Sequence, residues 1–158
     1  MARTIRRTAI AAAMLGAALV LAGCSATNPI TTQYSYAPSD GVRVQLADGV
    51  SVENLMVLTE GEGQLGHVLG AVVNRSTQDM RVSLRIGDGG ATVPVQVPAK
   101  GEVNFTDEKV TTPSVAVPPG GVLPATVSAD DTGVVSVDVP VLDGTIPPYD
   151  KYLQQNQA

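Results

Sequence analysis

Met80–Ile86, with the sequence MRVSLRI, is the stretch that decides the fold class of this chain. Apolar and polar residues alternate along it without a break, and a repeat of two places every apolar side chain on one face of a β-strand. Val135–Val141 repeats the pattern with valine at every second position, and Pro140 within it is typical of an edge strand or of the end of a strand. Both stretches therefore predict half-buried strands.

Shorter apolar runs extend this pattern over the body of the chain. Turn-forming segments rich in glycine, proline and asparagine separate the runs, and no segment after Gly23 keeps a helical period. Six weaker strands are predicted at Val50–Leu58, His67–Asn74, Thr92–Val97, Glu102–Phe105, Ser114–Val117 and Val122–Ser128. Together these about eight short strands predict an all-β fold, an antiparallel β-sandwich of immunoglobulin-like or cupredoxin-like type. The predicted domain covers residues 41–145.

Residues 1–23 have the three parts of an export signal. Basic residues, among them Arg6 and Arg7, precede the uncharged stretch Ala9–Ala22, and small residues follow it. A membrane-spanning helix needs roughly 20 apolar residues. The shorter stretch therefore predicts a cleaved signal peptide, with an uncleaved anchor as the alternative. The arginine pair leaves open whether export uses the general or the twin-arginine route.

The residues Leu21, Ala22, Gly23 and Cys24 resemble the bacterial lipobox. The resemblance implies a diacylglyceryl group on Cys24, the only cysteine of the chain, and cleavage just before it. Two acyl chains hold a protein stably on a bilayer, whereas a single chain gives marginal attachment. The expected partner is therefore the lipid bilayer, and the expected location is the extracytoplasmic face of the cell membrane. A free thiol or an intermolecular disulfide is the alternative for Cys24.

Segments with weak strand signals flank the predicted domain. Residues 24–40 contain serines, threonines and two prolines and carry no charge before Asp40, so they predict a tether of about 20–25 Å. Tyr34 and Tyr36 alternate with polar residues there, which leaves a first edge strand open. Residues 146–158 contain two prolines near their start and end in glutamine and asparagine, which predicts a flexible or loosely docked tail.

Charge and aromatic content exclude several classes of function. All 15 acidic residues and seven of the ten basic residues follow Cys24, which leaves a formal charge of −8 on that part of the chain. Such a charge repels nucleic acid, so no nucleic-acid partner is expected. The chain has no tryptophan and one phenylalanine. This argues against a carbohydrate-binding module, because such sites commonly use aromatic walls.

Three stretches resemble a known family. Val117–Gly121 and Ser128–Val141 look like the C-terminal end of the periplasmic copper-chaperone sandwich of the PCuAC type, and His67–Asp79 looks like that family's early strand and asparagine-led turn. The layout as a whole resembles the LpqE-like envelope lipoproteins of high-GC Gram-positive bacteria, which share a lipobox, a tether and this kind of sandwich. The resemblance implies an extracytoplasmic lipoprotein from a group whose function is largely unassigned.

The chain departs from the copper ligands of the PCuAC family, which are histidines and methionines. His67 is the only histidine, Met56 and Met80 are the only methionines after Cys24, and Arg85–Lys109, where the resemblance places the ligands, contains neither type. No cofactor is therefore expected. A copper-handling relative with an altered site is the alternative function, with His67 as a weak candidate ligand because imidazole suits copper.

Residues that commonly carry catalysis are sparse. His67 shares a strand face with apolar residues and is predicted to be a core or rim histidine, and no Gly-x-Ser-x-Gly elbow of a serine hydrolase occurs. The acidic turns Glu60–Glu62 and Asp130–Asp131 offer oxygen ligands for Ca²⁺ but lack the spacing of a dedicated loop. Arg81 and Arg85 are predicted to face solvent or an acidic partner. The sequence thus predicts that the protein is not an enzyme but a non-catalytic binding or interaction module of the cell envelope.

Overall fold

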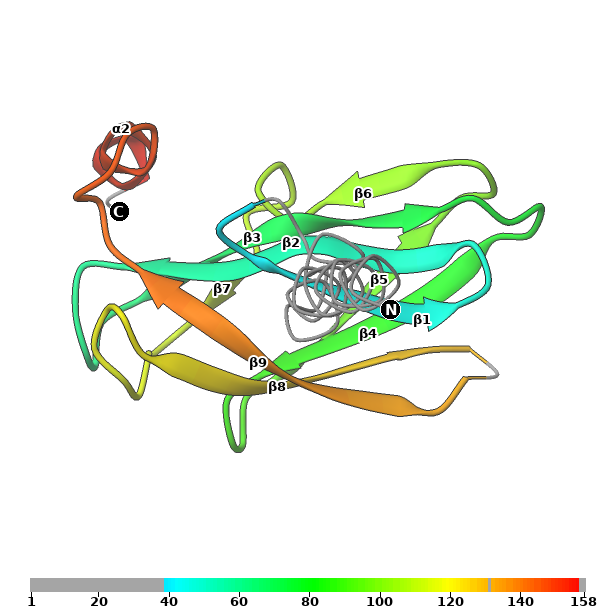
Figure 1. Cartoon of the computed structure of the whole chain (residues 1–158), viewed down its shortest axis with the longest axis horizontal. Coiled ribbons are helices and arrows are strands. Elements are labelled where there is room, and N and C mark those ends of the chain that lie inside the picture. The colour runs from blue at the N-terminus through cyan, green and yellow to red at the C-terminus, as the bar shows by residue number, and fades with distance from the viewer. Residues whose placement is uncertain (1–38, 131, 157–158) are drawn as a thin grey trace, which may run out of the picture. The chain divides into compact units, whose positions relative to one another are not determined.

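The computed structural model describes residues 39–130 and 132–156, which form strands and one short helix (Figure 1). The strands are β1 (Val42–Ala47), β2 (Val50–Thr59), β3 (Gly66–Asn74), β4 (Met80–Ile86), β5 (Thr92–Val97), β6 (Glu102–Asn104), β7 (Thr111–Thr112), β8 (Val122–Ala129) and β9 (Val134–Leu142). The helix is α2 (Tyr149–Gln155). The predicted all-β class is therefore confirmed.

Three differences separate the predicted strands from the observed ones. The short strand β7 has no predicted counterpart. Ser114–Val117 is not a strand; instead, the backbone N–H of Val115 donates to the carbonyl oxygen of Gln64 at 2.9 Å and anchors a loop. Strand β1 was not predicted, although its apolar residues alternate with polar ones. The edge strand considered at Tyr34 and Tyr36 lies outside the described residues.

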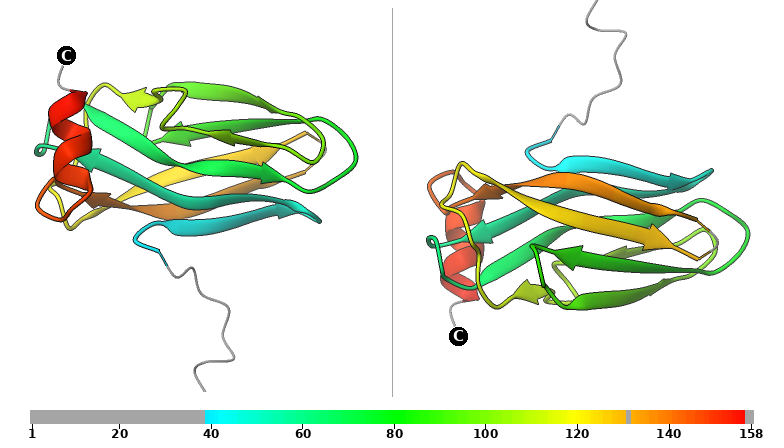
Figure 2. Two further views of the ribbon diagram at one scale, coloured as in Figure 1. Left: turned by 90° about the horizontal axis from the view of Figure 1, so that it is seen from above. Right: turned by 90° about the horizontal axis from the view of Figure 1, so that it is seen from below.

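The strands form a nearly closed mixed sheet rather than a purely antiparallel sandwich. Hydrogen-bonded neighbours follow the order β5-β4-β8-β9-β2-β3-β6, with β1 also paired to β2 and β7 to β3. Strands β2 and β9 run parallel and pair at Val57–Val141 and Leu58–Leu142. The predicted antiparallel sandwich is wrong in this respect, because the end of β9 runs beside β2 and joins two antiparallel halves into a barrel-like layer (Figure 2).

The core lies between the two halves of this layer. Val82 and Leu84 of β4 are fully buried, whereas Arg81 and Arg85 are exposed, as the alternation of Met80–Ile86 predicts. Phe105, the only phenylalanine, is also fully buried. Full burial of a large apolar side chain contributes about 1.5–3 kcal/mol relative to leaving it exposed. Apolar packing therefore accounts for the stability of a domain whose chain contains a single cysteine.

A β-bulge in β2 explains why this strand shows no simple alternation. The pairing of β2 with β3 shifts between Glu53 and Met56, and Asn54 within the shift has a φ of 53°. Val52 faces the core before the bulge and Leu55 faces it afterwards. The extra residue thus changes which sequence positions are buried, as bulges do.

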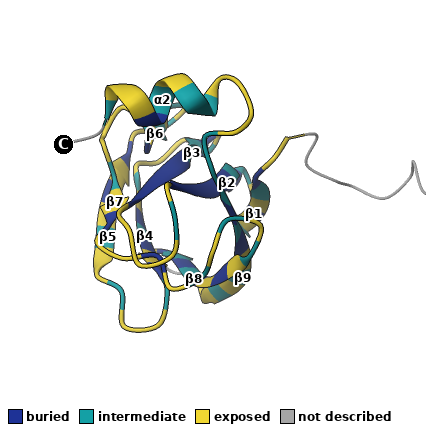
Figure 3. Cartoon of the chain, turned by 90° about the vertical axis from the view of Figure 1, so that its left-hand side faces the viewer, coloured by how far each residue is buried: buried dark blue, intermediate teal, exposed yellow. Residues whose placement is uncertain are grey.

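Helix α2 covers the outer face of β2 and β3 (Figure 3). It contributes Leu153 to a second apolar cluster, whose other buried members are Met56, Leu58 and Leu69. Tyr149, Tyr152 and Leu153 follow one another at helical spacing, so one side of the helix packs against the sheet. Residues 146–158 were predicted to form a flexible or a loosely docked tail, and the helix fits the docked alternative, because its apolar and aromatic side chains pack against the sheet.

No helix among the described residues has the length and apolarity needed to cross a bilayer. The predicted signal peptide, the four lipobox residues and most of the predicted tether lie outside the described residues. The expectations about these segments stay predictions.

Candidate functional site

His67 lies on the outer face of β3, beneath helix α2. It pairs with Leu58 of β2, while Leu69 pairs with Met56, so the side chains of His67 and Met56 leave neighbouring strands on the same face. His67 is 8% exposed, as expected for a core or rim histidine, and its ring meets that of Tyr152 edge-on with the centroids 5.6 Å apart. Burial lowers the pKa of His67, and the charge of Glu60 opposes this effect. The neutral imidazole is therefore favoured.

Met80, the other methionine considered for copper, lies elsewhere. It is half-buried and packs against the main core from the first position of β4, as predicted from its place in the inward row. Met56 is 2% exposed and belongs to the cluster beneath α2. The fold therefore brings His67 together with one of the two methionines and keeps the second away.

Tyr149 connects helix α2 to the start of the described domain. Its hydroxyl donates a hydrogen bond to Oδ2 of Asp40 at 2.6 Å, across 109 positions of sequence. Burial, together with this hydrogen bond and the negative charge of Asp40, raises the pKa of Tyr149 to about 12. The contact fixes the helix beside the point where the chain enters β1.

The raised pKa of Tyr149 predicts a loss of stability at high pH. The value of about 12 in the folded protein lies above the ordinary value of 10.0, so the stabilisation is complete below pH 10 and is lost as the pH rises through 12. We expect the difference in unfolding free energy between wild type and Tyr149→Phe to shrink over this range, measured by urea unfolding at each pH. A difference that stays constant up to pH 12 would contradict the assignment.

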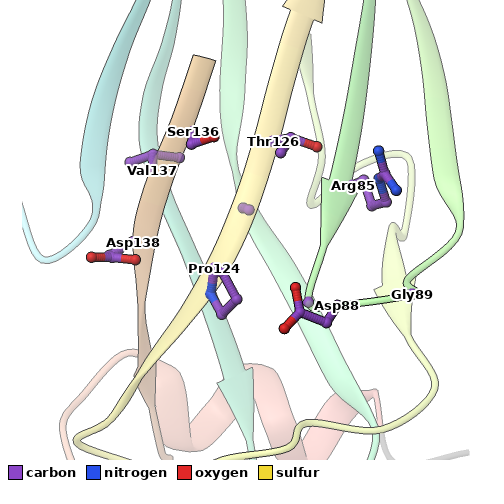
Figure 4. A pocket seen from close by; sticks show the side chains of 10 residues that line it. Arg85, Asp88, Gly89, Pro124, Thr126, Ser136, Val137 and Asp138 are labelled. Carbon is purple, nitrogen blue, oxygen red and sulfur yellow. The ribbon is translucent and has the colours of Figure 1, made fainter. Parts of the chain in front are cut away.

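A cavity of about 420 Å³ opens on the outer face of β4, β8 and β9 (Figure 4). Arg85, Thr126 and Ser136 pair in register and form a polar row across the three strands. Asp88 in the β4–β5 hairpin and Asp138 of β9 complete the charged lining. Within the described chain, the side chain of Arg85 forms neither an ion pair nor a hydrogen bond. The surface therefore offers an available cation, as predicted for the outward face of β4.

The two acidic turns considered for Ca²⁺ lie in separate loops. Oγ1 of Thr59 lies 3.0 Å from the carbonyl oxygen of Gly61 and 2.9 Å from that of Leu65, which fixes the turn that contains Glu60. Asp130 is exposed in the β8–β9 turn, and its neighbour at position 131 is outside the described residues. The described residues contain no group of three or more His, Cys, Asp or Glu side chains placed to hold a metal ion.

Sequence reasoning missed the contacts made by Tyr149 and Tyr152. A signal for them was present, because an aromatic residue three positions before another, with Leu153 next to the second, fits one face of a helix. The surrounding prolines and glutamines favoured a flexible segment instead. Only docking on the sheet makes so short a helix stable, since isolated helices of this length are marginal in water.

Comparison with known proteins finds no matching family model and no matching curated protein. Among solved structures, the copper-bound PCuAC domain from PmoF2 is 18% identical, with a TM-score of 0.48 and coverage of 64% of this chain and 97% of that one. The apo PmoF2 PCuAC domain is 17% identical, with a TM-score of 0.47 and coverage of 66% and 97%. Both carry the name of the copper-chaperone family that parts of this sequence resemble, whereas the LpqE-like resemblance stays a prediction.

Proposed function

We propose that the protein is an extracytoplasmic lipoprotein, attached to the cell membrane through Cys24, whose β-domain is a non-catalytic binding module of the cell envelope. One observation carries the proposal: the lone cysteine stands at the end of a lipobox-like run, directly after a short apolar stretch. Each buried methylene of an acyl chain contributes about 0.8 kcal/mol, so a diacylglyceryl group holds a charged domain at the bilayer without a spanning helix.

The described domain supports a role in binding through its outward surfaces. Arg81 and Arg85 project from β4 to solvent, and an open polar cavity lies beside the second of them. Regular strands hold these side chains on a rigid sheet, which lowers the entropic cost of binding a partner. The candidate partner is another component of the envelope.

Replacement of Cys24 by serine tests the anchor. We expect wild type in the membrane fraction, with an intact mass that begins at Cys24 and includes acyl chains. Cys24→Ser is expected to accumulate as an uncleaved precursor or to be released, because serine offers no thiol for the thioether. Ser25→Ala is the matched control and should behave as wild type. Unchanged processing and membrane attachment of Cys24→Ser, or a mature form without an acyl increment, would refute the assignment.

The binding role is tested by crosslinking in intact cells followed by mass spectrometry. We expect a reproducible partner whose crosslinks fall on the outer faces of the strands and are weakened in Arg85→Glu. If replicate experiments return no common partner, the proposal of a binding module loses its support, while the anchor assignment is judged by the test on Cys24.

A copper-handling role is the second candidate function. It is favoured by the placement of Met56 and His67 on one outer face of β2 and β3, since thioether and imidazole groups are suitable ligands for Cu(I). Helix α2 covers both residues, so the helix would have to move to admit an ion.

Copper titration separates the two candidate functions. If copper handling is correct, the mature protein binds one Cu(I) per chain under reducing conditions, and both His67→Ala and Met56→Leu abolish binding. Met80→Leu is the matched control and should still bind one Cu(I), because Met80 packs against the main core and not beside His67. An absence of stoichiometric binding, or binding unchanged by His67→Ala, removes the copper-handling candidate.

A further inference from the structure

A second polar cavity, of about 430 Å³, lies at the edge of β3 and β6, where the β3–β4 and β5–β6 loops meet. These loops are at the end of the domain opposite helix α2 (Figure 1). Two cationic residues line the cavity, Arg75 from the first loop and Lys100 from the second. The fold thus brings together two positive side chains that are 25 positions apart in the sequence.

Asn74 fixes the two loops to each other. It is 1% exposed, and its Nδ2 donates to the carbonyl oxygens of Gln78 at 2.8 Å and Pro98 at 3.1 Å. Its Oδ1 accepts from the backbone N–H of Ser76 at 3.0 Å. These bonds span both loops, so the backbone that carries the two cations is held before any ligand arrives.

Lys100 is held in place by its own bonds. Its backbone N–H donates to the carbonyl oxygen of Ser76 at 3.1 Å, and its Nζ donates to the carbonyl oxygen of Arg75 at 2.6 Å. Its φ is 58°, a conformation that a lysine seldom adopts. The ammonium group is therefore fixed next to the backbone of the residue that carries the guanidinium group.

Glu102 lines the same cavity, but among the described residues no carboxylate lies at ion-pair distance from either cation. In the described part of the chain neither Arg75 nor Lys100 forms an ion pair, although acidic residues outnumber basic ones by 15 to seven after Cys24. Two neighbouring cations repel each other. An oxyanion between them would relieve that repulsion and form charge-assisted hydrogen bonds, which are about twice as strong as neutral ones.

We propose that Arg75 and Lys100 form a binding site for one oxyanion, a carboxylate or a phosphate group carried by an envelope component. The inference gives a ligand chemistry to the binding module proposed above. Glu102 also lines the cavity. A ligand with a hydroxyl or ammonium group beside its oxyanion therefore gains a further contact, whereas a second negative charge is repelled.

The experiment titrates the purified mature protein with two probes, inorganic phosphate and acetate, and follows backbone amide shifts by NMR. We expect saturable shifts at Arg75 and at 99–101, with half-saturation on the order of 10 mM or below for at least one probe. Tighter binding of phosphate would identify a phosphate-bearing ligand, and tighter binding of acetate a carboxylate-bearing one. Binding should weaken as salt is raised, because added ions screen exposed charges.

Matched variants show whether the two cations form the site. Lys100→Gly keeps a backbone with positive φ and should weaken binding about tenfold, whereas Lys109→Gly, at a φ of 50°, is the control and should leave it unchanged. Arg75→Gln should weaken binding to a similar extent. Arg43→Gln is its control, because the guanidinium of Arg43 is already paired with Glu53 at 3.0 Å.

Three outcomes would overturn the inference: no saturable shift with either probe, the same affinity in Lys100→Gly and Arg75→Gln as in wild type, or an equal loss in the control variants. The titration uses the mature protein with or without its lipid, in detergent where required. Its failure would therefore leave the anchor assignment standing, and failure of the anchor test would leave this site standing.

Discussion

Replacing Asn74 by alanine is expected to lower the free energy of unfolding by about 3 kcal/mol or more. The amide accepts from the N–H and hydroxyl of Ser76 and donates to the carbonyl oxygens of Gln78, Val97 and Pro98. Removing it breaks these five hydrogen bonds, and the backbone N–H of Ser76 loses its acceptor. The loss of one bond costs about 0.5–1.5 kcal/mol, and a buried group left unsatisfied costs about 1–3 kcal/mol. Urea unfolding followed by circular dichroism measures the change.

Asn104→Ala is the matched control for this prediction. Asn104 is exposed, and its Oδ1 accepts one hydrogen bond, from the N–H of Thr106 at 2.9 Å. We expect Asn104→Ala to lower the free energy of unfolding by less than about 1 kcal/mol, because water replaces this bond. If the two asparagine variants lose equal stability, burial and the number of hydrogen bonds do not explain the role of Asn74.

Gly70→Ala is expected to destabilise the protein by about 3 kcal/mol or more, because it combines an unfavourable backbone conformation with a steric clash. Gly70 has a φ of 122°, and a Cβ there would lie 2.8 Å from the carbonyl oxygens of both Glu53 and Asn54. These are backbone atoms of the β2 bulge, so a side-chain rotation cannot relieve the contact. The expected result is a large fall in the urea midpoint with the slope unchanged.

Gly63→Ala separates the clash from the backbone effect. Gly63 also has a positive φ, 77°, but no atom lies within 4 Å of the Cβ position. Gly63→Ala should therefore lower the free energy of unfolding by only about 1 kcal/mol. If Gly70→Ala loses no more unfolding free energy than Gly63→Ala, β2 shifts to accommodate the methyl group. The bulge would then not be tightly held.

The sequence predicted some features of the candidate sites and not others. The outward direction of Arg81 and Arg85 was predicted, because alternation along a single strand defines its two faces. The neighbourhood of Arg75 and Lys100 was not predicted, because it depends on how two loops meet. The asparagine-led turn was recognised as a resemblance, yet the function of Asn74 in bonding both loops becomes visible only with the second loop in place.

Chain-local patterns determined the all-β class of this protein, the positions of most strands and the buried faces of β4 and β9, because each of these depends on the order of apolar and polar residues along one strand. The same patterns supplied the expectation of a lipid anchor at Cys24. Tertiary structure alone decided the parallel pairing of β2 with β9, the docking of α2 over His67, and the meeting of two cations at the opposite end. Each of these contacts joins segments far apart in the chain, and alternation shows which side of a strand is buried but not which neighbour it meets.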